Sequence, residues 1–211
     1  MNVLGVTDLG LFVGAGLILN ITPGADLLYI TSRSAAQGKK AGVIAAFGIG
    51  TGCLVHVTAA SFGLSMILVS SSLLFSLVKY LGAAYLIYLG IQTLVSLRKG
   101  DATPEKPDPE TALAQIYRQA ILINALNPKV ALFFMALLPQ FVSRDAAHPS
   151  LTFLFLGILF TVNGTMVNIL MALFTSLLRS RFQRMALLPK LLKSLVGTLF
   201  VALGARLALS S

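Results

Sequence analysis

Hydrophobic and polar positions fall in long blocks along this chain of 211 residues, and six of the blocks are apolar. They cover approximately residues 8–31, 41–69, 73–97, 117–142, 151–178 and 190–209. A helix needs about 20 apolar residues to cross the hydrocarbon core of a bilayer, and every block is long enough. The pattern therefore predicts an all-α polytopic membrane protein with six transmembrane helices.

The longest polar segment lies between the third and fourth blocks, over residues 98–116. It combines glycine, three prolines and charges of both signs, which is typical of a connector between folded units. We therefore expect a first three-helix unit over residues 1–97, a cytoplasmic linker over 98–116 and a second three-helix unit over 117–211.

Composition agrees with a membrane location. The chain is 56% hydrophobic and 11% charged, and its mean hydropathy is +0.87, which excludes a soluble domain of this size. The net charge of +9 does not indicate nucleic-acid binding, because the basic residues lie between apolar blocks and do not form a face with interleaved aromatics. A lone cysteine, Cys53, excludes a disulfide framework.

The distribution of Lys and Arg near the ends of the apolar blocks predicts the orientation. If the N-terminus lies outside, twelve of these residues face the cytoplasm and three (Lys79, Arg144 and Arg206) face outward. Cytoplasmic loops carry the excess of positive charge, so both termini are predicted on the periplasmic or outer side. Each half then has an odd number of crossings, and the second half must insert upside down relative to the first.

A proline motif occurs in the first and in the fourth apolar block. Residues 20–26 read NITPGAD and residues 124–129 read NALNPK. Proline removes a backbone donor and breaks or kinks a membrane helix, and the freed polar groups are tolerated only where protein or water covers them. Two such breaks in corresponding places indicate the central site of a transporter. The expected architecture is therefore a 3+3 inverted repeat with broken first and fourth helices.

The two breaks are predicted to lie at the same depth. Pro23 is ten residues before Arg33, and Pro128 is ten residues after Arg118. At about 1.5 Å of rise per residue, both prolines lie roughly 15 Å from the cytoplasmic boundary, near the middle of the bilayer. They can therefore face one another.

Asp26 and Lys129 are the ionisable residues that lie beside these breaks. An ionisable group at this depth costs at least about 2.5 kcal/mol, so it is a functional candidate. Asp26 could carry a proton or a cation, and Lys129 could supply a counter-charge or contact the carboxylate of a substrate. The alternative is a static Asp26–Lys129 pair that joins the two halves.

Neutral polar residues near the breaks complete the predicted substrate site. Its members are Asn20, Thr22, Pro23, Gly24, Asp26, Asn124, Asn127, Pro128, Lys129 and Asn163. The amides and the hydroxyl could instead satisfy backbone groups that the prolines free. Asn163 is chosen over Asn168 because it adjoins Gly164, and residues five apart cannot share a narrow helix face.

Other residues have competing interpretations. His56 could relay protons or form a structural hydrogen bond. The pairs Gly10/Gly14 and Gly48/Gly52 predict close helix approach, within one chain or in a homo-oligomer. The sequence has no phosphate-binding loop, no Cys/His cluster and no plausible nucleophile with a base, so we expect no cofactor, no metal and no enzymatic activity.

An ordered set of motifs resembles the LysE/RhtB family of amino-acid exporters over essentially the whole chain. The motifs are TPGADLL at residues 22–28, RS at 33–34, QGKKAG at 37–42, KYLGAAYLIYLG at 79–90, NPK at 127–129 and LPQF at 138–141. The resemblance implies a six-helix exporter of free amino acids in a bacterial inner membrane, coupled to proton influx. The family often has proline where this chain has Ala25.

The expected function is therefore secondary active export of a free amino acid, or a close derivative, by proton antiport with alternating access at a midplane site. A cation or metal permease is a second hypothesis, which the ammonium of Lys129 disfavours by repelling cations. A non-transporting scaffold subunit is the third. The expected partners are the amino acid, protons and the lipid bilayer.

Overall fold

The computed structural model describes residues 5–64, 110–143 and 145–177, together with Asp108 and scattered helical positions between 77 and 95 and between 194 and 209. Within these residues the chain is helical, apart from an isolated β-bridge between Val6 and Val142. An all-helical membrane protein is thus confirmed for the part that the structure describes.

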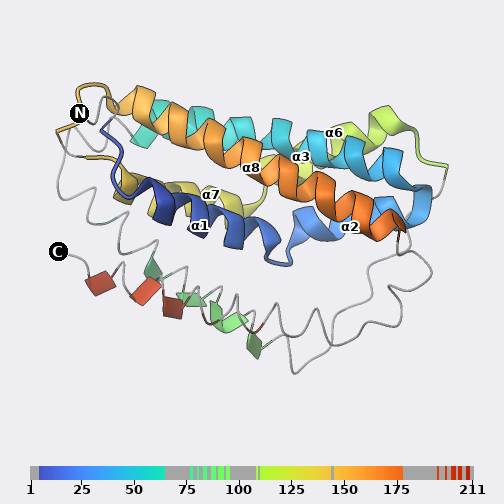
Figure 1. The fold of residues 1–211 in the computed structure, drawn as a ribbon, viewed down its shortest axis with the longest axis horizontal. Coiled ribbons are helices and arrows are strands. Elements are labelled where there is room, and N and C mark those ends of the chain that lie inside the picture. The colour runs from blue at the N-terminus through green and yellow to red at the C-terminus, as the bar shows by residue number, and fades with distance from the viewer. Residues whose placement is uncertain are drawn as a thin grey trace.

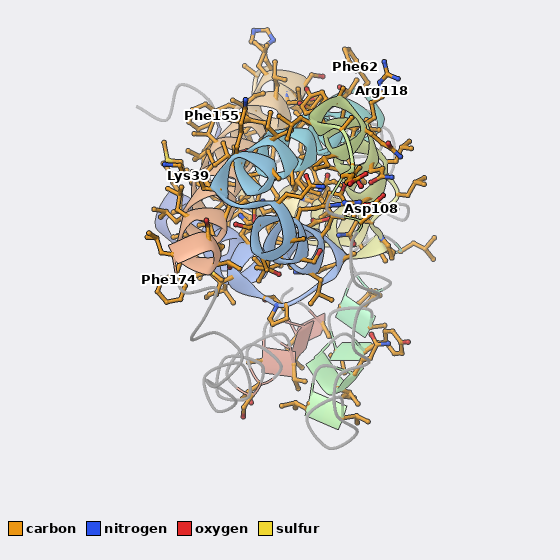
Figure 2. All side chains as sticks on the ribbon, turned by 90° about the vertical axis from the view of Figure 1, so that its right-hand side faces the viewer. Lys39, Phe62, Asp108, Arg118, Phe155 and Phe174 are labelled. Atoms are coloured by element: carbon orange, nitrogen blue, oxygen red, sulfur yellow. The ribbon has the colours of Figure 1, made fainter. Side chains whose placement is uncertain are left out.

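Two long helices are apolar enough to cross a membrane without interruption. The first is α3 (Lys39–Ala59), which continues as the π-helical turn η1 (Ala60–Leu64), and the second is α8 (Pro149–Leu177). Large apolar side chains such as Phe62, Phe155 and Phe174 lie exposed on the helices and point away from the bundle, as lipid-facing residues would (Figure 2).

Two pairs of shorter helices are bent at the predicted breaks. The chain bends by 52° between helices α1 (Leu9–Ile21) and α2 (Ala25–Gln37). Helix α6 (Leu113–Ala125) is followed by α7 (Pro128–Ala136) and the 3₁₀ turn η2 (Leu138–Phe141), with a bend of 45°. The predicted interruption of the first and fourth spans is therefore confirmed, and the described residues contain up to four crossings if each bent pair counts as one.

Some boundaries differ from the prediction. Helix α2 runs to Gln37, beyond the expected end at residue 31, and α6 begins at Leu113, so residues 113–116 belong to a helix and not to the linker. The physical reason is visible at Ile116, which is fully buried in the core.

The third and sixth predicted spans and most of the linker fall outside the described residues, so their extents stay predictions. One contact between those spans is described. A Cβ added at Gly204 would lie 2.7 Å from Cγ1 of Ile87 and 2.8 Å from the carbonyl oxygen of Ala83. The two segments thus pack closely at this point.

The bent pairs run in opposite directions through the bundle, and so do α3 and α8 (Figure 1). Each half therefore contains a bent pair followed by a long helix, with the second set reversed. This is the arrangement that an inverted repeat requires, although the repeat as a whole, including its third helices, stays a prediction.

Helix α3 packs against α6 through two glycines. A Cβ at Gly48 would lie 2.6 Å from the carbonyl oxygen of Tyr117, and one at Gly52 would lie 2.5 Å from that of Ile121. The close approach predicted for this pair is confirmed. At Gly10 and Gly14, by contrast, an added Cβ meets no described atom within 4 Å, so that pair brings no described helix close.

Gly52→Ala is expected to lower the thermal unfolding midpoint of the purified protein. The added methyl must separate α3 from the backbone of α6, and overpacking of this kind costs about 1–3 kcal/mol. Gly14→Ala is the matched control, because its methyl enters open space. Equal midpoints for the two variants would show that α3 and α6 do not approach as closely as described.

One end of the bundle is closed by apolar packing and by backbone pairing. The rings of Phe133 and Phe160 stack with centroids 4.9 Å apart, and Phe134 meets Phe160 edge-on at 5.3 Å. Beyond them the N-terminal segment pairs with the chain after α7, where Thr7 N donates to Phe141 O at 2.9 Å. By the charge count this is the outer end.

Candidate functional site

The two helix breaks lie near the middle of the bundle's length (Figure 1). In a continuous helix each carbonyl accepts from the N–H four residues later. Pro23 therefore leaves Leu19 O without its helical donor, and Pro128 does the same to Asn124 O. Each carbonyl must find another donor, and those donors connect the two halves of the chain.

Lys129, in the second break, supplies the donor for the first. Its Nζ donates to Leu19 O at 2.8 Å and to Thr22 O at 2.9 Å. These carbonyls form the C-terminal end of α1, where the helix dipole favours a positive charge. Gly24 lies directly beside this contact, since a Cβ added there would be 3.4 Å from Lys129 Nζ. The ammonium of Lys129, which belongs to the second half of the chain, thus caps the C-terminal end of α1 in the first half.

His56 on α3 supplies a donor for the second break. Its Nε2 lies 2.9 Å from Asn124 O, which also accepts from Asn127 N at 2.9 Å. A carbonyl only accepts, so Nε2 carries the hydrogen. The sequence left two roles open for His56, a proton relay and a structural hydrogen bond. This contact fits the structural hydrogen bond.

Asp26 lies in the first turn of α2, where the helix dipole favours a negative charge. Its Oδ2 accepts from Nδ2 of Asn124 at 2.9 Å, and its Oδ1 is buried without a hydrogen-bond partner. Lys129 makes its described hydrogen bonds to the backbone of the first break. A direct static pair between Asp26 and Lys129, the alternative raised by the sequence, is therefore not what the structure contains.

Several predicted residues support the breaks locally. Asn127 caps α7, because its Oδ1 accepts from Lys129 N at 3.0 Å, and Thr22 Oγ1 donates to Ile18 O at 2.6 Å. Pro128 occupies the first turn of α7 and is exposed. Pro23 and Gly24 shape the first break. The contacts of Asn127 and Thr22 fit the alternative that the sequence left open, in which these side chains satisfy backbone groups at the breaks.

A cavity of about 30 Å³ lies between the breaks and the facing sides of α3 and α8. Five of the ten predicted site residues line it: Asn20, Thr22, Asp26, Asn124 and Lys129. Pro23, Gly24, Asn127, Pro128 and Asn163 do not. This volume admits a water molecule and is too small for an amino acid.

Asn163 does not line the cavity, whereas Asn168 does. Asn168 is 5% exposed and lies one turn from Gly164 on the inner face of α8, while Asn163 points to another side of the helix. Thr161 and Thr165 share the inner face and were also missed. The spacings of four residues from Thr161 to Thr165 and three from Thr165 to Asn168 are the signal that could have identified them.

Apolar residues form the remaining walls of the cavity. Leu19 and Val130 come from the broken helices, and Ile49 and Cys53 come from α3, with Phe160 on α8. Polar side chains line the cavity at the breaks and, as Thr161, Thr165 and Asn168, on α8, with apolar side chains between them. A mixed lining with a few polar groups among apolar ones is typical of sites for small molecules.

Three polar atoms of the cavity lining are buried without partners. They are the acceptors Asp26 Oδ1 and Asn124 Oδ1 and the donor Asn20 Nδ2. An unsatisfied buried polar atom costs about 1–3 kcal/mol, so the set indicates a ligand that fills it. Two acceptors suit an ammonium group and the donor suits a carboxylate. The described residues contain no group of three or more His, Cys, Asp or Glu that could hold a metal ion.

Comparisons with known proteins give the family. A family model described as LysE type translocator matches residues 17–211. An uncharacterized membrane protein of Pseudomonas aeruginosa is 35% identical, over 99% of this chain and 98% of its own length. Leucine efflux proteins of Salmonella choleraesuis and Salmonella typhimurium are each 29% identical, over 97% of this chain and 96% of their own length. No protein of known structure matches.

Proposed function

This chain belongs to the LysE type translocator family, and from that premise we propose that it exports a free amino acid from the cytoplasm. Members of the family are transporters and not enzymes, and the relatives that are leucine efflux proteins support an amino acid as the substrate. The bacterial relatives support a location in the inner membrane, and the charge count supports both termini on the periplasmic side.

The unpartnered polar atoms of the cavity carry the proposal. The ammonium of the substrate binds Asp26 Oδ1 and Asn124 Oδ1, and its carboxylate binds Asn20 Nδ2. Lys129 holds two carbonyls, so the third N–H of its ammonium is directed to the same carboxylate. Each end of a zwitterion thereby meets groups of opposite polarity that would otherwise stay unsatisfied.

The apolar walls support a substrate with an aliphatic side chain. Ile49, Val130 and Phe160 line the cavity and can cover an aliphatic side chain, next to the polar side chains of Thr161, Thr165 and Asn168. Leucine, the substrate named for the Salmonella relatives, has the required shape and polarity. We therefore take leucine and similar branched amino acids as the substrates.

Proton antiport by alternating access completes the proposed mechanism. With the site open to the cytoplasm, ionised Asp26 binds the ammonium of the amino acid. Once the site opens outward, Asp26 takes up a proton. Its side chain is then neutral and no longer holds the ammonium of the substrate, which is released. The protonated site then returns, and Asp26 loses its proton to the cytoplasm.

Two other functions make different predictions. A cation permease would place its ion against Asp26, where the nearby ammonium of Lys129 repels it. A scaffold subunit has no use for three unpartnered polar atoms that surround a cavity. The export function is favoured over both for these reasons.

A panel of the twenty amino acids is expected to separate the three functions. Leucine, isoleucine and valine should raise the thermal unfolding midpoint of the purified protein, because a ligand that binds only the folded state stabilises it. The same amino acids should exchange across liposome membranes in counterflow. Asn20→Leu should remove the response, while Asn163→Leu, which changes an asparagine outside the cavity, should keep it.

A shift by metal ions but not by amino acids would favour the permease. No shift by any amino acid and no counterflow would favour the scaffold. Stabilisation by lysine or arginine in place of leucine would agree with amino-acid export. It would overturn the proposal that the apolar lining selects branched aliphatic substrates.

A further inference from the structure

A polar seam joins α2 to α6 and to the residues that precede α6. Successive turns of α2 place Asp26, Tyr29, Arg33 and Gln37 on this seam. Asp26 meets Asn124 at the central cavity, and Gln37 donates to Asp108 O at 2.9 Å at the far end. The seam thus leads from the cavity to the end of the bundle that the charge count predicts to be cytoplasmic.

Arg33 holds the middle of the seam. Its Nη1 donates to Thr111 Oγ1 at 2.9 Å and to Asp108 O at 3.2 Å, and its Nη2 donates to Gln119 Oε1 at 3.1 Å. Gln119 Oε1 also accepts from Tyr29 Oη at 2.9 Å, and the guanidinium lies 5.4 Å from the centre of the Tyr29 ring. One side chain of α2 therefore contacts both α6 and the linker.

The position of Arg33 departs from what the sequence indicates. Its charge is counted among those at the cytoplasmic surface, yet the side chain is only 8% exposed and its Nε is buried without a partner. Each of its hydrogen-bond acceptors among the described residues is neutral. A buried cation whose described hydrogen-bond acceptors are all neutral is a functional candidate.

The two ends of the cavity differ in what closes them. Toward the outer end, the packed rings of Phe133, Phe134 and Phe160 must leave apolar contacts if they separate. Toward the seam, the amides, hydroxyls and guanidinium that join α2 to α6 lie beside buried apolar side chains such as Ile30 and Ile116. The polar contacts of the seam, unlike the stacked rings, can be replaced by hydrogen bonds to water when α2 and α6 separate.

Helix α2 is bounded at both ends by a glycine. Its N-terminal end follows the break at Pro23 and Gly24, and its C-terminal end is Gly38, with φ of +84°. At positive φ only glycine turns the chain without strain. Between Gly24 and Gly38, α2 is a continuous helix that carries one whole side of the seam.

We propose that the α2–α6 seam is the cytoplasmic gate and that Arg33 is its latch, which the carboxylate of an incoming amino acid releases by binding the guanidinium. A carboxylate forms stronger, bidentate hydrogen bonds with arginine than neutral acceptors do, so it displaces Thr111 and Gln119. The gate then opens toward a substrate that carries a carboxylate. From Arg33 to Asp26 is two turns of α2, along which the amino acid passes to the cavity.

The chain contains its own reporter of this gate. Cys53, its sole cysteine, is 4% exposed and lines the cavity, so its alkylation by N-ethylmaleimide requires the cavity to open. Without any ligand, Arg33→Gln should speed this alkylation in purified full-length protein at least about tenfold, since it removes a charge-assisted hydrogen bond. Arg118→Gln, which changes an exposed arginine on α6 that points outward (Figure 2), should leave the rate unchanged.

Two fragments of leucine test the carboxylate. With unaltered protein, 4-methylpentanoate, which lacks the ammonium, should speed alkylation of Cys53, and 3-methylbutylamine, which lacks the carboxylate, should not. In Arg33→Gln neither compound should add to the rate. Gln119→Leu, which removes the acceptor shared by Tyr29 and Arg33, provides a second route to an open seam if Arg33→Gln does not fold.

Equal acceleration by the amine and the carboxylate would overturn the release step. Folded Arg33→Gln or Gln119→Leu protein that reacts as slowly as the unaltered protein would overturn the latch. The inference rests on the proposed amino-acid export, but the ligand-free arms need no substrate. Their failure is therefore distinct from a failure to bind or transport leucine.

Discussion

Replacing Asp26 with asparagine is expected to reduce proton-driven export of leucine to the level of empty liposomes while the protein stays folded. The new amide oxygen can still accept from Asn124 Nδ2, so the link between the breaks survives. The variant has no carboxylate to pair with an ammonium and no proton to exchange. Leucine binding should weaken roughly tenfold to a hundredfold, the loss expected for one charge-assisted hydrogen bond.

The measurement is leucine flux in liposomes under an imposed pH gradient, with thermal unfolding as the check on folding. Asp145→Asn is the matched control, because Asp145 is an exposed acid in the loop before α8. Full gradient-driven flux in Asp26→Asn would remove Asp26 from the coupling mechanism.

Replacing Lys129 with methionine is expected to lower both the thermal midpoint and the affinity for leucine. Methionine keeps the length of the side chain, but Leu19 O and Thr22 O lose their donor from the other half of the protein. Leu19 O still accepts from Thr22 N at 3.2 Å, so Thr22 O is the carbonyl left without a donor, at a cost of about 1–3 kcal/mol. The substrate carboxylate also loses its cation, so this single change acts on folding and on binding together.

Thermal unfolding with and without leucine measures both effects. Lys40→Met is the control, since Lys40 is exposed in the first turn of α3. A Lys129→Met protein with unchanged midpoint and unchanged leucine affinity would show that this ammonium neither holds the first break nor contacts the substrate.

The helix breaks were predictable because their cause is local. Pro23 and Pro128 each remove one backbone donor, and that loss can be counted from the sequence without knowledge of the fold. Which carbonyls are freed follows equally directly. The proximity of Asp26, Asn124 and Lys129 was also expected from the equal depth of the two breaks.

What satisfies the freed groups depends on tertiary packing and could not be read from the sequence. That Lys129 reaches Leu19 O, while His56 reaches Asn124 O, depends on how α3 and α7 lie against the breaks. The rotation of α8 decides between Asn163 and Asn168 in the same way. Arg33 was placed at the cytoplasmic boundary because the first apolar block ends before α2 does, and the polar residues that continue the helix give no hydrophobic signal.

The central claim is that the unsatisfied groups of two helix breaks form a site for a zwitterion. Calorimetric binding of leucine, 4-methylpentanoate and 3-methylbutylamine to the purified protein tests it most directly. The account predicts that leucine binds and that each fragment binds at least about tenfold more weakly, because each leaves one set of polar groups unsatisfied. A fragment that binds as tightly as leucine would contradict the claim.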